Sequence, residues 1–256
     1  MAGMNPIISQ WLDDILNAMA FLTRLPAPSR AGMTSPGLAR AYRAFPLIGA
    51  LIGAVIACAD LLLLRAGLSP MPAAALALGA GMLLTGAIHE DGLADVADGF
   101  GGGRDKAGKL AIMRDSRLGT FGALALLVTF AAKVGALAVL PGDNTLLDMM
   151  VIHALSRAPL AVIAARMSYA RDDGLAVAAG RPDARTALAS CFVAAVIALI
   201  CLPFGAALKA MLAVAAATFC LAILAQRQIG GQTGDVLGAA EQVGEVALLA
   251  LLSVQA

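Results

Sequence analysis

The sequence predicts an all-α protein that is embedded in a membrane as a bundle of helices. Of the 256 residues, 60% are apolar and only 14% are charged, whereas a water-soluble domain carries about 25% charged residues. Aromatic residues make up only 4% of the chain and Ala, Leu and Gly are abundant, which is typical of helices that pack through small residues in lipid. The net charge of +1 excludes a broad basic surface for nucleic acid. We expect a single membrane-embedded domain over 1–256, with an amphipathic helix and a cytoplasmic loop in 1–44 and a transmembrane bundle in 45–254.

An amphipathic helix is predicted close to the N-terminus. Its apolar residues repeat at i, i+3 and i+4, and they are Ile8, Trp11, Leu12, Ile15, Leu16, Met19 and Leu22. Asp13, Asp14 and Asn17 lie opposite, so the helix is too polar to cross a bilayer. We expect it to lie at the membrane surface. Because two aspartates have the wrong sign for such a helix, packing on the bundle is the alternative.

Seven apolar runs follow, each close to the roughly 20 residues that cross a bilayer. They lie near 45–64, 71–88, 118–140, 146–165, 187–203, 204–225 and 236–254. The fifth and sixth runs meet at a tight turn around Pro203, and the last run is weakened by Glu241 and Glu245. We therefore expect about seven transmembrane helices, with six as the alternative count.

The basic residues of the loops predict the orientation of the bundle. Alternate loops carry nearly all of them, whereas the opposite loops carry only Arg65. The first set comprises Arg24, Arg30, Arg40, Arg43, Arg104, Lys106, Lys109, Arg114, Arg117, Arg166, Arg171, Arg181, Arg185 and Arg227. Because cytoplasmic loops are enriched in Lys and Arg, this asymmetry places the N-terminus in the cytoplasm and the C-terminus outside.

Four carboxylates, Glu90, Asp91, Asp95 and Asp98, follow the second run in what we expect to be a cytoplasmic loop from residue 89 to residue 117. On a helix the three aspartates fall within about a 60° arc and share one face. Like charges at this spacing repel, so they require a compensating cation, and oxygen ligands favour Mg²⁺ or Mn²⁺. We predict that the three aspartates bind the metal. Glu90 is a further candidate, although it points about 100° away from Asp91; a solvated acidic loop is the alternative.

Glycines at 99 and 101–103 follow the acids and precede Arg104 and Lys106. Glycine lets backbone amides approach phosphate oxygens, and the nearby cations would neutralise them. A flexible linker explains the glycines equally well. Arg114 is either a phosphate ligand or an anchor at the membrane surface, and Asp115 beside it is a further candidate for the site.

A second polar run, residues 230–238, precedes the last predicted span. The orientation argument puts it on the same face as the acidic run, so Asp235 could complete a metal or nucleophile site, and Thr233 is expected to contact substrate. Glu241 and Glu245 follow at i and i+4 in an apolar helix. They are costly in lipid and should face the bundle interior, either for function or as a structural pairing.

Other ionisable residues within or next to the spans have separate predictions. Arg157 should face a polar cavity and is a candidate for binding substrate phosphate. His89 either accepts a proton during catalysis or caps a helix. We expect a structural ion pair between Lys133 and Asp148, and we interpret His153 as a helix-packing residue.

Five short segments of this sequence resemble one enzyme family. They are Phe21-Leu22-Thr23-Arg24-Leu25-Pro26, Phe45-Pro46-Leu47-Ile48-Gly49, His89-x-Asp91-Gly92-Leu93-Ala94-Asp95-x-x-Asp98-Gly99, Met113-Arg114-Asp115-Ser116 and Gly231-x-Thr233-Gly234-Asp235-x-x-Gly238. In this order and spacing they resemble adenosylcobinamide-GDP ribazoletransferase, also called cobalamin synthase, from about residue 18 to residue 252. Gln232 stands at a position that is often aromatic in this family.

The resemblance implies a Mg²⁺-dependent enzyme of the bacterial inner membrane, with its active site on the cytoplasmic face. Such an enzyme joins adenosylcobinamide-GDP to α-ribazole or its 5′-phosphate, releases GMP and forms adenosylcobalamin or its phosphate. We expect no nucleic-acid partner, while a homo-oligomer or contacts with other enzymes of the cobalamin pathway stay open. The expected catalytic residues are His89, Asp91, Asp95, Asp98 and Asp235, and Arg24 joins the residues expected to bind substrate.

Two other classes of membrane protein are the alternatives. A transporter concentrates its polar residues at the bilayer midplane, often in two repeated halves, whereas the acids here gather at one interface. A CDP-alcohol phosphotransferase also uses acidic motifs at the membrane face with Mg²⁺. Its pattern has Ala-Arg after the first Asp-Gly pair, and here Ala94 is followed by Asp95.

Overall fold

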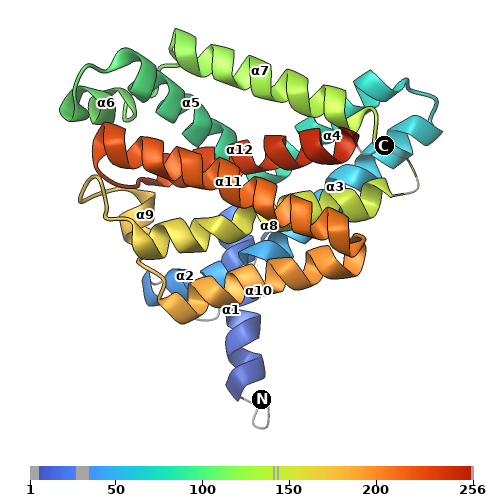
Figure 1. Ribbon diagram of the computed structural model, residues 1–256, viewed down its shortest axis with the longest axis horizontal. Coiled ribbons are helices and arrows are strands. Elements are labelled where there is room, and N and C mark those ends of the chain that lie inside the picture. Colours follow the sequence, from blue (N-terminus) through green and yellow to red (C-terminus); the bar gives the residue numbers. More distant parts are fainter. Residues whose placement is uncertain (1–5, 27–34, 141, 143, 255–256) are drawn as a thin grey trace.

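The computed structural model describes residues 6–26, 35–140, 142 and 144–254, and the regular elements within these ranges are helices (Figure 1). They are α1 (Pro6–Leu22), α2 (Ser35–Ala41), the 3₁₀ helix η1 (Tyr42–Ala44), α3 (Phe45–Arg65), α4 (Pro70–Thr85), α5 (Ile88–Gly102), α6 (Lys106–Ile112), α7 (Thr120–Leu137), α8 (Thr145–Arg166), α9 (Leu175–Ala179), α10 (Ala184–Cys201), α11 (Phe204–Ile229) and α12 (Gly234–Val254). The predicted all-α fold is confirmed.

Six helical segments of the described chain are long and apolar enough to cross a membrane. They are Gly37–Arg65, Thr120–Leu137, Thr145–Arg166, Ala184–Cys201, Phe204–Ile229 and Gly234–Val254. A seventh span is obtained if α4 and α5, which are joined at a bend of 93°, count as one broken span. The chain is therefore a multi-pass helical membrane protein, and the two counts predicted from the sequence correspond to the two ways of treating this bend.

The bend changes the prediction for the second apolar run and the acids that follow it. Gly86 and Ala87 both adopt the left-handed backbone conformation, with φ of 72° and 56°, and a right-handed helix cannot continue through such residues. Residues 88–102, expected at the start of a cytoplasmic loop, form helix α5, which confirms the helical spacing predicted for Asp91, Asp95 and Asp98. The backbone amide of Arg24 donates to the carbonyl oxygen of Leu84 at 2.7 Å, which satisfies one of the carbonyl groups left free at the end of α4.

The loops gather at two opposite ends of the bundle, as Figure 1 shows. The segments 103–119, 167–183 and 230–233 lie at one end, whereas the turns after α3 and α10 lie at the other. The loop after α5 and the loop before α12 therefore share an end, as the alternation of basic loops predicts. Arg30, one of the basic residues used in that argument, lies outside the described residues.

Helix α1 packs on the bundle, and it does so partly through its polar side. Asp14 is fully buried and accepts hydrogen bonds from Nε of Arg40 at 2.8 Å and Nε of Arg43 at 2.6 Å. The guanidinium of Arg43 also lies 4.1 Å from the ring centroid of Trp11. Ile8, assigned to the apolar face, is 58% exposed. The alternative prediction, packing on the bundle, is confirmed. The outward orientation expected of the aspartates is corrected for Asp14, because two arginines make it favourable for Asp14 to face inward.

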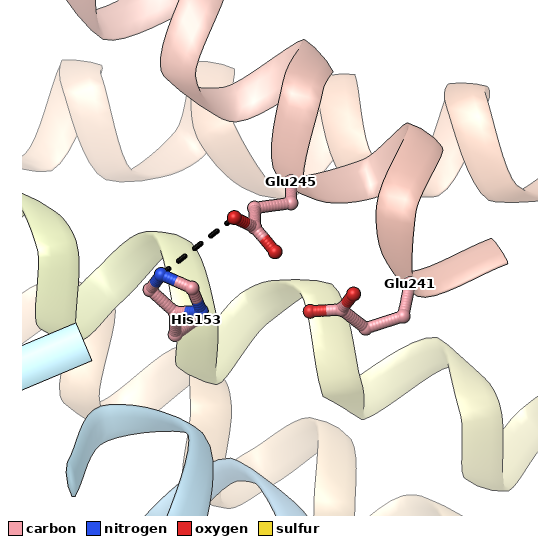
Figure 2. Close-up of side chains that lie close together, drawn as sticks. All are labelled: His153, Glu241 and Glu245. Atoms are coloured by element: carbon pink, nitrogen blue, oxygen red, sulfur yellow. Dashed lines mark ion pairs between the residues drawn. The ribbon is translucent and has the colours of Figure 1, made fainter. Parts of the chain in front are cut away.

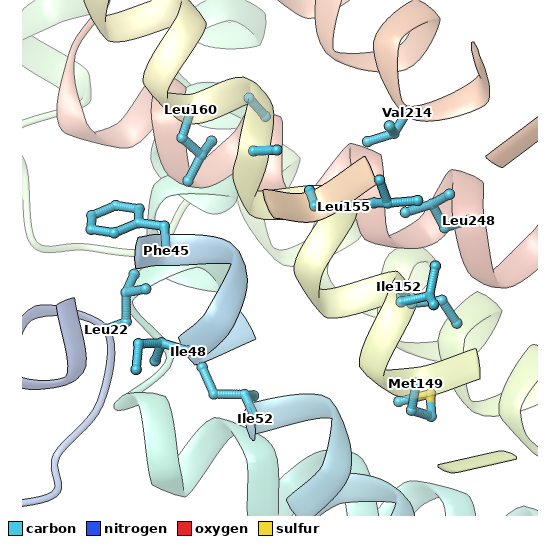
Figure 3. Packing of buried hydrophobic residues seen from close by; sticks show 14 of the residues in the cluster. Leu22, Phe45, Ile48, Ile52, Met149, Ile152, Leu155, Leu160, Val214 and Leu248 are labelled. Carbon is cyan, nitrogen blue, oxygen red and sulfur yellow. The ribbon is translucent and has the colours of Figure 1, made fainter. Parts of the chain in front are cut away.

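The core lies around α8, which is the most enclosed of the spanning helices. Of its apolar 18-residue stretch, 72% is buried inside the protein. Figure 3 shows the apolar side chains that α3, α8 and α12 contribute, among them Ile52, Ile152 and Leu248. Helix α3 approaches α8 at Gly49 and Gly53, where an added Cβ atom would collide with the backbone of α8. Close approach through small residues replaces the hydrophobic effect as the cause of helix association in lipid.

Candidate active site

Three carboxylates from segments far apart in the sequence converge beside one pocket. Asp91 and Asp95 lie on α5, and Asp235 lies in the first turn of α12. Asp91 and Asp235 both line the pocket, and Asp95 lies within electrostatic range of both. In the described part of the chain no donor makes a hydrogen bond to the carboxylate of Asp91 or Asp95. Their oxygen atoms are therefore free to bind a cation.

Two glycines allow α5 and α12 to come this close. A Cβ atom on Gly92 would lie 2.8 Å from the carbonyl oxygen of Asp235, and one on Gly238 would lie 3.2 Å from the backbone of His89. The first distance is shorter than any that Cβ atoms adopt, so a side chain at Gly92 would force the helices apart. The glycines of both sequence motifs thus bring Asp91 and Asp235 to the same place.

Thr233 fixes the position of Asp235 at the start of α12. Its Oγ1 accepts a hydrogen bond from the amide of Val236 at 3.2 Å, as a helix N-cap does, and donates one to Oδ2 of Asp235 at 3.2 Å. Because Thr233 is only 2% exposed, its observed role is to orient Asp235. Direct contact between Thr233 and substrate stays a prediction.

Asp98 has a different environment from the other two aspartates of α5. Its Oδ2 accepts from the amide of Gly119 at 2.7 Å and its Oδ1 from the amide of Gly122 at 2.8 Å. These amides belong to the free N–H groups at the start of α7, so Asp98 caps that helix from a neighbouring one. Each oxygen of Asp98 already accepts one backbone donor, unlike those of Asp91 and Asp95 among the described residues, and metal binding by Asp98 stays a prediction.

Arg171 completes the group around Asp235, and sequence reasoning did not select it as a site residue. Hydrogen bonds from Ala170 N to Gln232 O (2.9 Å) and from Gln232 N to Ser168 O (2.8 Å) tie its loop to the segment before α12. Nη2 of Arg171 then lies 3.3 Å from Oδ2 of Asp235. Its buried Nε and Nη1 atoms have no hydrogen-bond acceptor among the described residues, although Nε lies 3.6 Å from Oδ1 of Asp173. The only sequence signal was a basic residue in a loop.

The glycines after the acids do not form a loop that could wrap a phosphate. Residues 99, 101 and 102 belong to the last turns of α5, and the amide of Gly103 donates to the carbonyl of Gly99 at 3.0 Å. A Cβ atom on Gly101 would collide with the ring of Phe121. The glycines therefore serve close packing, and both sequence interpretations, phosphate contact and flexible linker, are corrected.

The cations predicted to bind phosphate lie outside the pocket lining. Arg104 and Lys106 are exposed around the start of α6. Arg114 donates to Asp173 at 2.6 Å, and this bond lowers the pKa of the Asp173 carboxyl. Asp115 pairs with Arg117, whose hydrogen bonds lower the pKa of Asp115 to about 2. The structure thus gives protein partners to Arg114 and Asp115, and substrate contact by these residues stays a prediction.

Arg24 lies at the bend between α4 and α5. Its guanidinium lies against Gly86, where a Cβ atom would be 2.5 Å from Nε of Arg24. Arg24 and Asp91 line a second, open groove, which adjoins the pocket because Asp91 lines both. The predicted substrate role of Arg24 is therefore compatible with its position.

A second group of polar side chains, the interior cluster, is enclosed between α7, α8 and α12. It comprises Lys133, His153, Ser156, Arg157, Glu241, Gln242 and Glu245, and all seven side chains are buried. Nη1 of Arg157 lies 2.7 Å from Oε1 of Glu241, and His89 reaches the same carboxylate with Nδ1 at 3.3 Å. The predicted inward orientation of the two glutamates is confirmed. Arg157, expected to bind substrate phosphate, pairs with Glu241, and contact between Arg157 and substrate stays a prediction.

The other half of the interior cluster corrects two further predictions. Lys133 pairs with Glu245 at 3.0 Å and donates to Gln242 at 2.7 Å, so it forms no pair with Asp148. Glu90 lies 3.9 Å from Lys133 and so faces this cluster as well as the surface. His153 is not an isolated packing residue, since Arg157 contacts its Nδ1 at 3.2 Å and its Nε2 lies 3.7 Å from Glu245 (Figure 2).

The interior cluster also contains ligand atoms at a spacing that could hold a metal, because those of His153, Glu241 and Glu245 lie within 4.8 Å of one another. However, Arg157 and Lys133 already neutralise the two glutamates. A divalent cation would be repelled by both. The carboxylates of Asp91, Asp95 and Asp235, with one arginine among them, are the better cation ligands.

Comparison with known proteins gives one consistent result. The family model described as cobalamin-5-phosphate synthase matches residues 14–253. An adenosylcobinamide-GDP ribazoletransferase of Bradyrhizobium diazoefficiens is 42% identical over 237 residues, covering 92% of this chain and 91% of the relative. The proteins of the same name from Sinorhizobium medicae and Mesorhizobium japonicum are 41% and 42% identical, each over 96% of this chain and over 98% and 94% of the relative. No solved structure matches.

Proposed function

Because the chain belongs to the cobalamin-5-phosphate synthase family of enzymes, we propose that it joins adenosylcobinamide-GDP to α-ribazole or α-ribazole 5′-phosphate. The products are GMP and adenosylcobalamin or its 5′-phosphate. The observation that carries the proposal is the convergence of Asp91, Asp95, Asp235 and Arg171, which we call the pocket cluster, beside one pocket. Carboxylates that can hold a metal ion, together with a guanidinium, are the groups that phosphoryl transfer requires.

The reaction is a substitution at phosphorus. A ribose hydroxyl of the acceptor attacks the phosphorus next to the cobinamide arm, and a new P–O bond forms. The bond from that phosphorus to the bridging oxygen breaks, and GMP leaves with the bridging oxygen. The hydroxyl proton passes to a base, while negative charge grows on the leaving group. Catalysis consists mainly of positioning the two substrates and stabilising this charge.

Asp91, Asp95 and Asp235 would hold Mg²⁺. The donor set fits, since it consists of carboxylate oxygens, which Mg²⁺ prefers, and those of Asp91 and Asp95 carry no hydrogen bond among the described residues. A bound ion supplies charge stabilisation for the phosphate oxygens. Three carboxylates close together also repel one another, so the site itself favours a cation.

Arg171 is suited to bind the diphosphate of the nucleotide substrate. Its side chain is only 13% exposed. Among the described residues Nη1 has no acceptor, and Nε has only a contact of 3.6 Å with Oδ1 of Asp173. A buried guanidinium with unused donors is costly unless a ligand satisfies them. Phosphate oxygens accept such donors in pairs, as the planar guanidinium presents them.

His89 is the candidate for accepting the hydroxyl proton. It lines the same pocket as Asp91 and Asp235, and donation from its Nδ1 to Glu241, 3.3 Å away, leaves the lone pair of Nε2 free in that tautomer. Glu241, which belongs to the interior cluster, thus favours the tautomer of His89 that carries its proton on Nδ1. This arrangement supports general-base catalysis by His89.

We place the reaction at the cytoplasmic face of the bacterial inner membrane. The loops at the pocket end of the bundle carry the arginines and lysines, whereas the opposite loops carry Arg65, and basic loops stay in the cytoplasm. A cysteine substitution at the exposed Gly102 should be protected from an impermeant thiol reagent in intact cells, and one at the exposed Gly142 should react. Labelling of position 102 from outside would contradict this orientation.

The proposed function is tested by the release of GMP from adenosylcobinamide-GDP by the purified enzyme in detergent. We expect release only when α-ribazole or its 5′-phosphate and Mg²⁺ are both present. A protein that is folded but releases no GMP with either acceptor would refute the proposal. Release of CMP from a CDP-alcohol lipid in the same preparation would instead favour the CDP-alcohol phosphotransferase alternative.

A further inference from the structure

The pocket beside the catalytic carboxylates is lined by two kinds of side chain. His89, Asp91 and Asp235 are polar and ionisable. Most of the remaining lining is apolar, and it includes three aromatic rings, those of Phe21, Tyr42 and Phe45. An apolar pocket with a few polar groups is typical of small-molecule sites.

The aromatic rings are concentrated here although the chain has few of them. It contains 8 Phe, 2 Tyr and 1 Trp, and three of these rings, from α1, η1 and α3, meet at the pocket wall. The centroids of Phe45 and Tyr42 are 4.5 Å apart with planes at 25°, and those of Phe45 and Phe21 are 5.8 Å apart with planes at 19°. The rings are stacked nearly parallel. Tyr42 and Phe45 are each only 2% exposed and Phe21 is partly buried, so a planar ring in the pocket would meet this stack mainly at Phe21.

We propose that this aromatic wall binds the benzimidazole base of α-ribazole, and this inference rests on the proposed function. The base is planar, bicyclic and mostly apolar, as the wall requires. With the base on the wall, the ribose attached to it extends toward Asp91 and Asp235, where its hydroxyl must attack. The nucleotide substrate then approaches from the other side of Asp91, along the groove that Arg24 lines.

The guanine base of the other substrate fits the wall less well. Guanine carries an N–H, an amino group and a carbonyl along its edge, and each needs a hydrogen-bond partner when it is buried. The polar side chains of the lining are His89, Asp91, Asp235 and Tyr42, and the first three are occupied by the reaction. A site that leaves such groups unpaired discriminates strongly against the ligand that carries them.

The position of α1 is explained by the same inference. Phe21 reaches the wall because α1 docks on the bundle, and the pairs from Asp14 to Arg40 and Arg43 hold it there. The first motif of the resemblance begins at Phe21 and the second at Phe45. Both motifs lack residues typical of catalysis, except Arg24, so a role in binding the base accounts for them.

The test measures initial rates with each substrate varied in turn, for Phe45→Leu and Phe21→Leu. Stacking of a base on an aromatic side chain contributes enough that we expect the KM for α-ribazole to rise about tenfold. For Phe45→Leu the KM for adenosylcobinamide-GDP should change less than twofold, because Phe45 does not line the groove of Arg24, whereas Phe21 lines both. Phe192→Leu is the matched control, because Phe192 is 67% exposed on α10 and outside the pocket, and it should behave as wild type.

A second measurement uses the unmodified enzyme and does not depend on the folding of any variant. Free benzimidazole should inhibit GMP release in competition with α-ribazole, and guanosine should not compete with α-ribazole. Competition by guanosine, or a rise in the KM for adenosylcobinamide-GDP alone in Phe45→Leu, would overturn the assignment of the wall. Neither result would affect the proposed function, which fails only if the wild type releases no GMP with either acceptor.

Discussion

Two clusters of charged side chains lie along α12, and they differ in how completely their members are paired. In the interior cluster two glutamates, Glu241 and Glu245, face two cations, Arg157 and Lys133, at 2.7 Å and 3.0 Å. In the pocket cluster three aspartates share Arg171, whose contact with Asp235 is 3.3 Å. Paired charges in a closed space stabilise one structure, whereas charges without a protein partner beside a pocket are available to water or to a ligand.

The sequence does not distinguish the two clusters, since both consist of acids at helical spacing near apolar runs. Glu241 and Glu245 are four residues apart, as Asp91 and Asp95 are. The difference arises from what the neighbouring helices supply. Helices α7 and α8 offer Lys133 and Arg157 to the glutamates, and α5 meets α12 at glycines that bring no cation with them. The following experiments should separate structural from functional charge.

The largest effect is expected in the interior cluster, for Arg157→Met. Removing one partner of a buried ion pair leaves Glu241 uncompensated and should lower the free energy of unfolding by about 3–5 kcal/mol. Thermal and denaturant unfolding in detergent measure this, with the exposed Arg185→Met as the control. The double variant Arg157→Met with Glu241→Leu should recover part of the loss. A single variant as stable as wild type would show that the cluster is not a structural pair.

The second expected effect is catalytic and concerns the pocket cluster. Asp95→Asn should lower the rate of GMP release by about a hundredfold or more, because each metal ligand contributes several kcal/mol to the transition state. The protein should stay folded and inserted. Chelation of divalent ions should abolish turnover of the wild type, and Mg²⁺ should restore it. The exposed Asp172→Asn is the matched control.

The same assay applied to Glu90→Gln compares two acids of the α5 motif, Glu90 beside the interior cluster and Asp95 in the pocket cluster. Glu90 faces Lys133, so we expect a loss of about tenfold at most. If this variant proved as damaging as Asp95→Asn, or if Asp95→Asn turned over normally at ordinary Mg²⁺, the division between the clusters would be wrong.

A smaller effect is expected for Arg171→Gln. If the free donors of Arg171 bind the diphosphate, the KM for adenosylcobinamide-GDP and the inhibition constant of GDP should rise about tenfold, since charge-assisted hydrogen bonds are lost. The KM for α-ribazole should be unchanged, and Arg171→Lys should recover part of the loss. If Arg171 only balances Asp235, the requirement for Mg²⁺ will change and nucleotide binding will not.

The smallest effect is expected for Asp98→Asn, and it is on stability. An amide retains one acceptor, so about 1 kcal/mol of the capping interaction with α7 should be lost. Turnover should fall little, and the dependence on Mg²⁺ should be that of the wild type. A shift in the Mg²⁺ requirement equal to that of Asp95→Asn would place Asp98 among the metal ligands.

Much of the fold could be predicted from the sequence because hydropathy and helical spacing are local properties. The apolar runs became α3, α7, α8, α10, α11 and α12, with bounds within a few residues. The bend after α4 was not predicted, since it requires left-handed conformations at Gly86 and Ala87, and alanine gives no signal for one. The candidate site was predicted where its residues lie in motifs, as with Asp91 and Asp235.

The sequence by itself therefore determined that the helices of this protein lie in lipid, and which types of side chain are present for its chemistry. Partition of a helix into lipid depends on the residues of that helix alone. The tertiary structure decided which charges meet. Arg157 and Glu241 are paired, Asp98 caps α7, and Arg171 stands beside Asp235, and each contact joins residues separated by at least twenty positions. Such pairing depends on distance in space, because electrostatic and hydrogen-bond energies fall off within a few ångströms, and no local pattern encodes that distance.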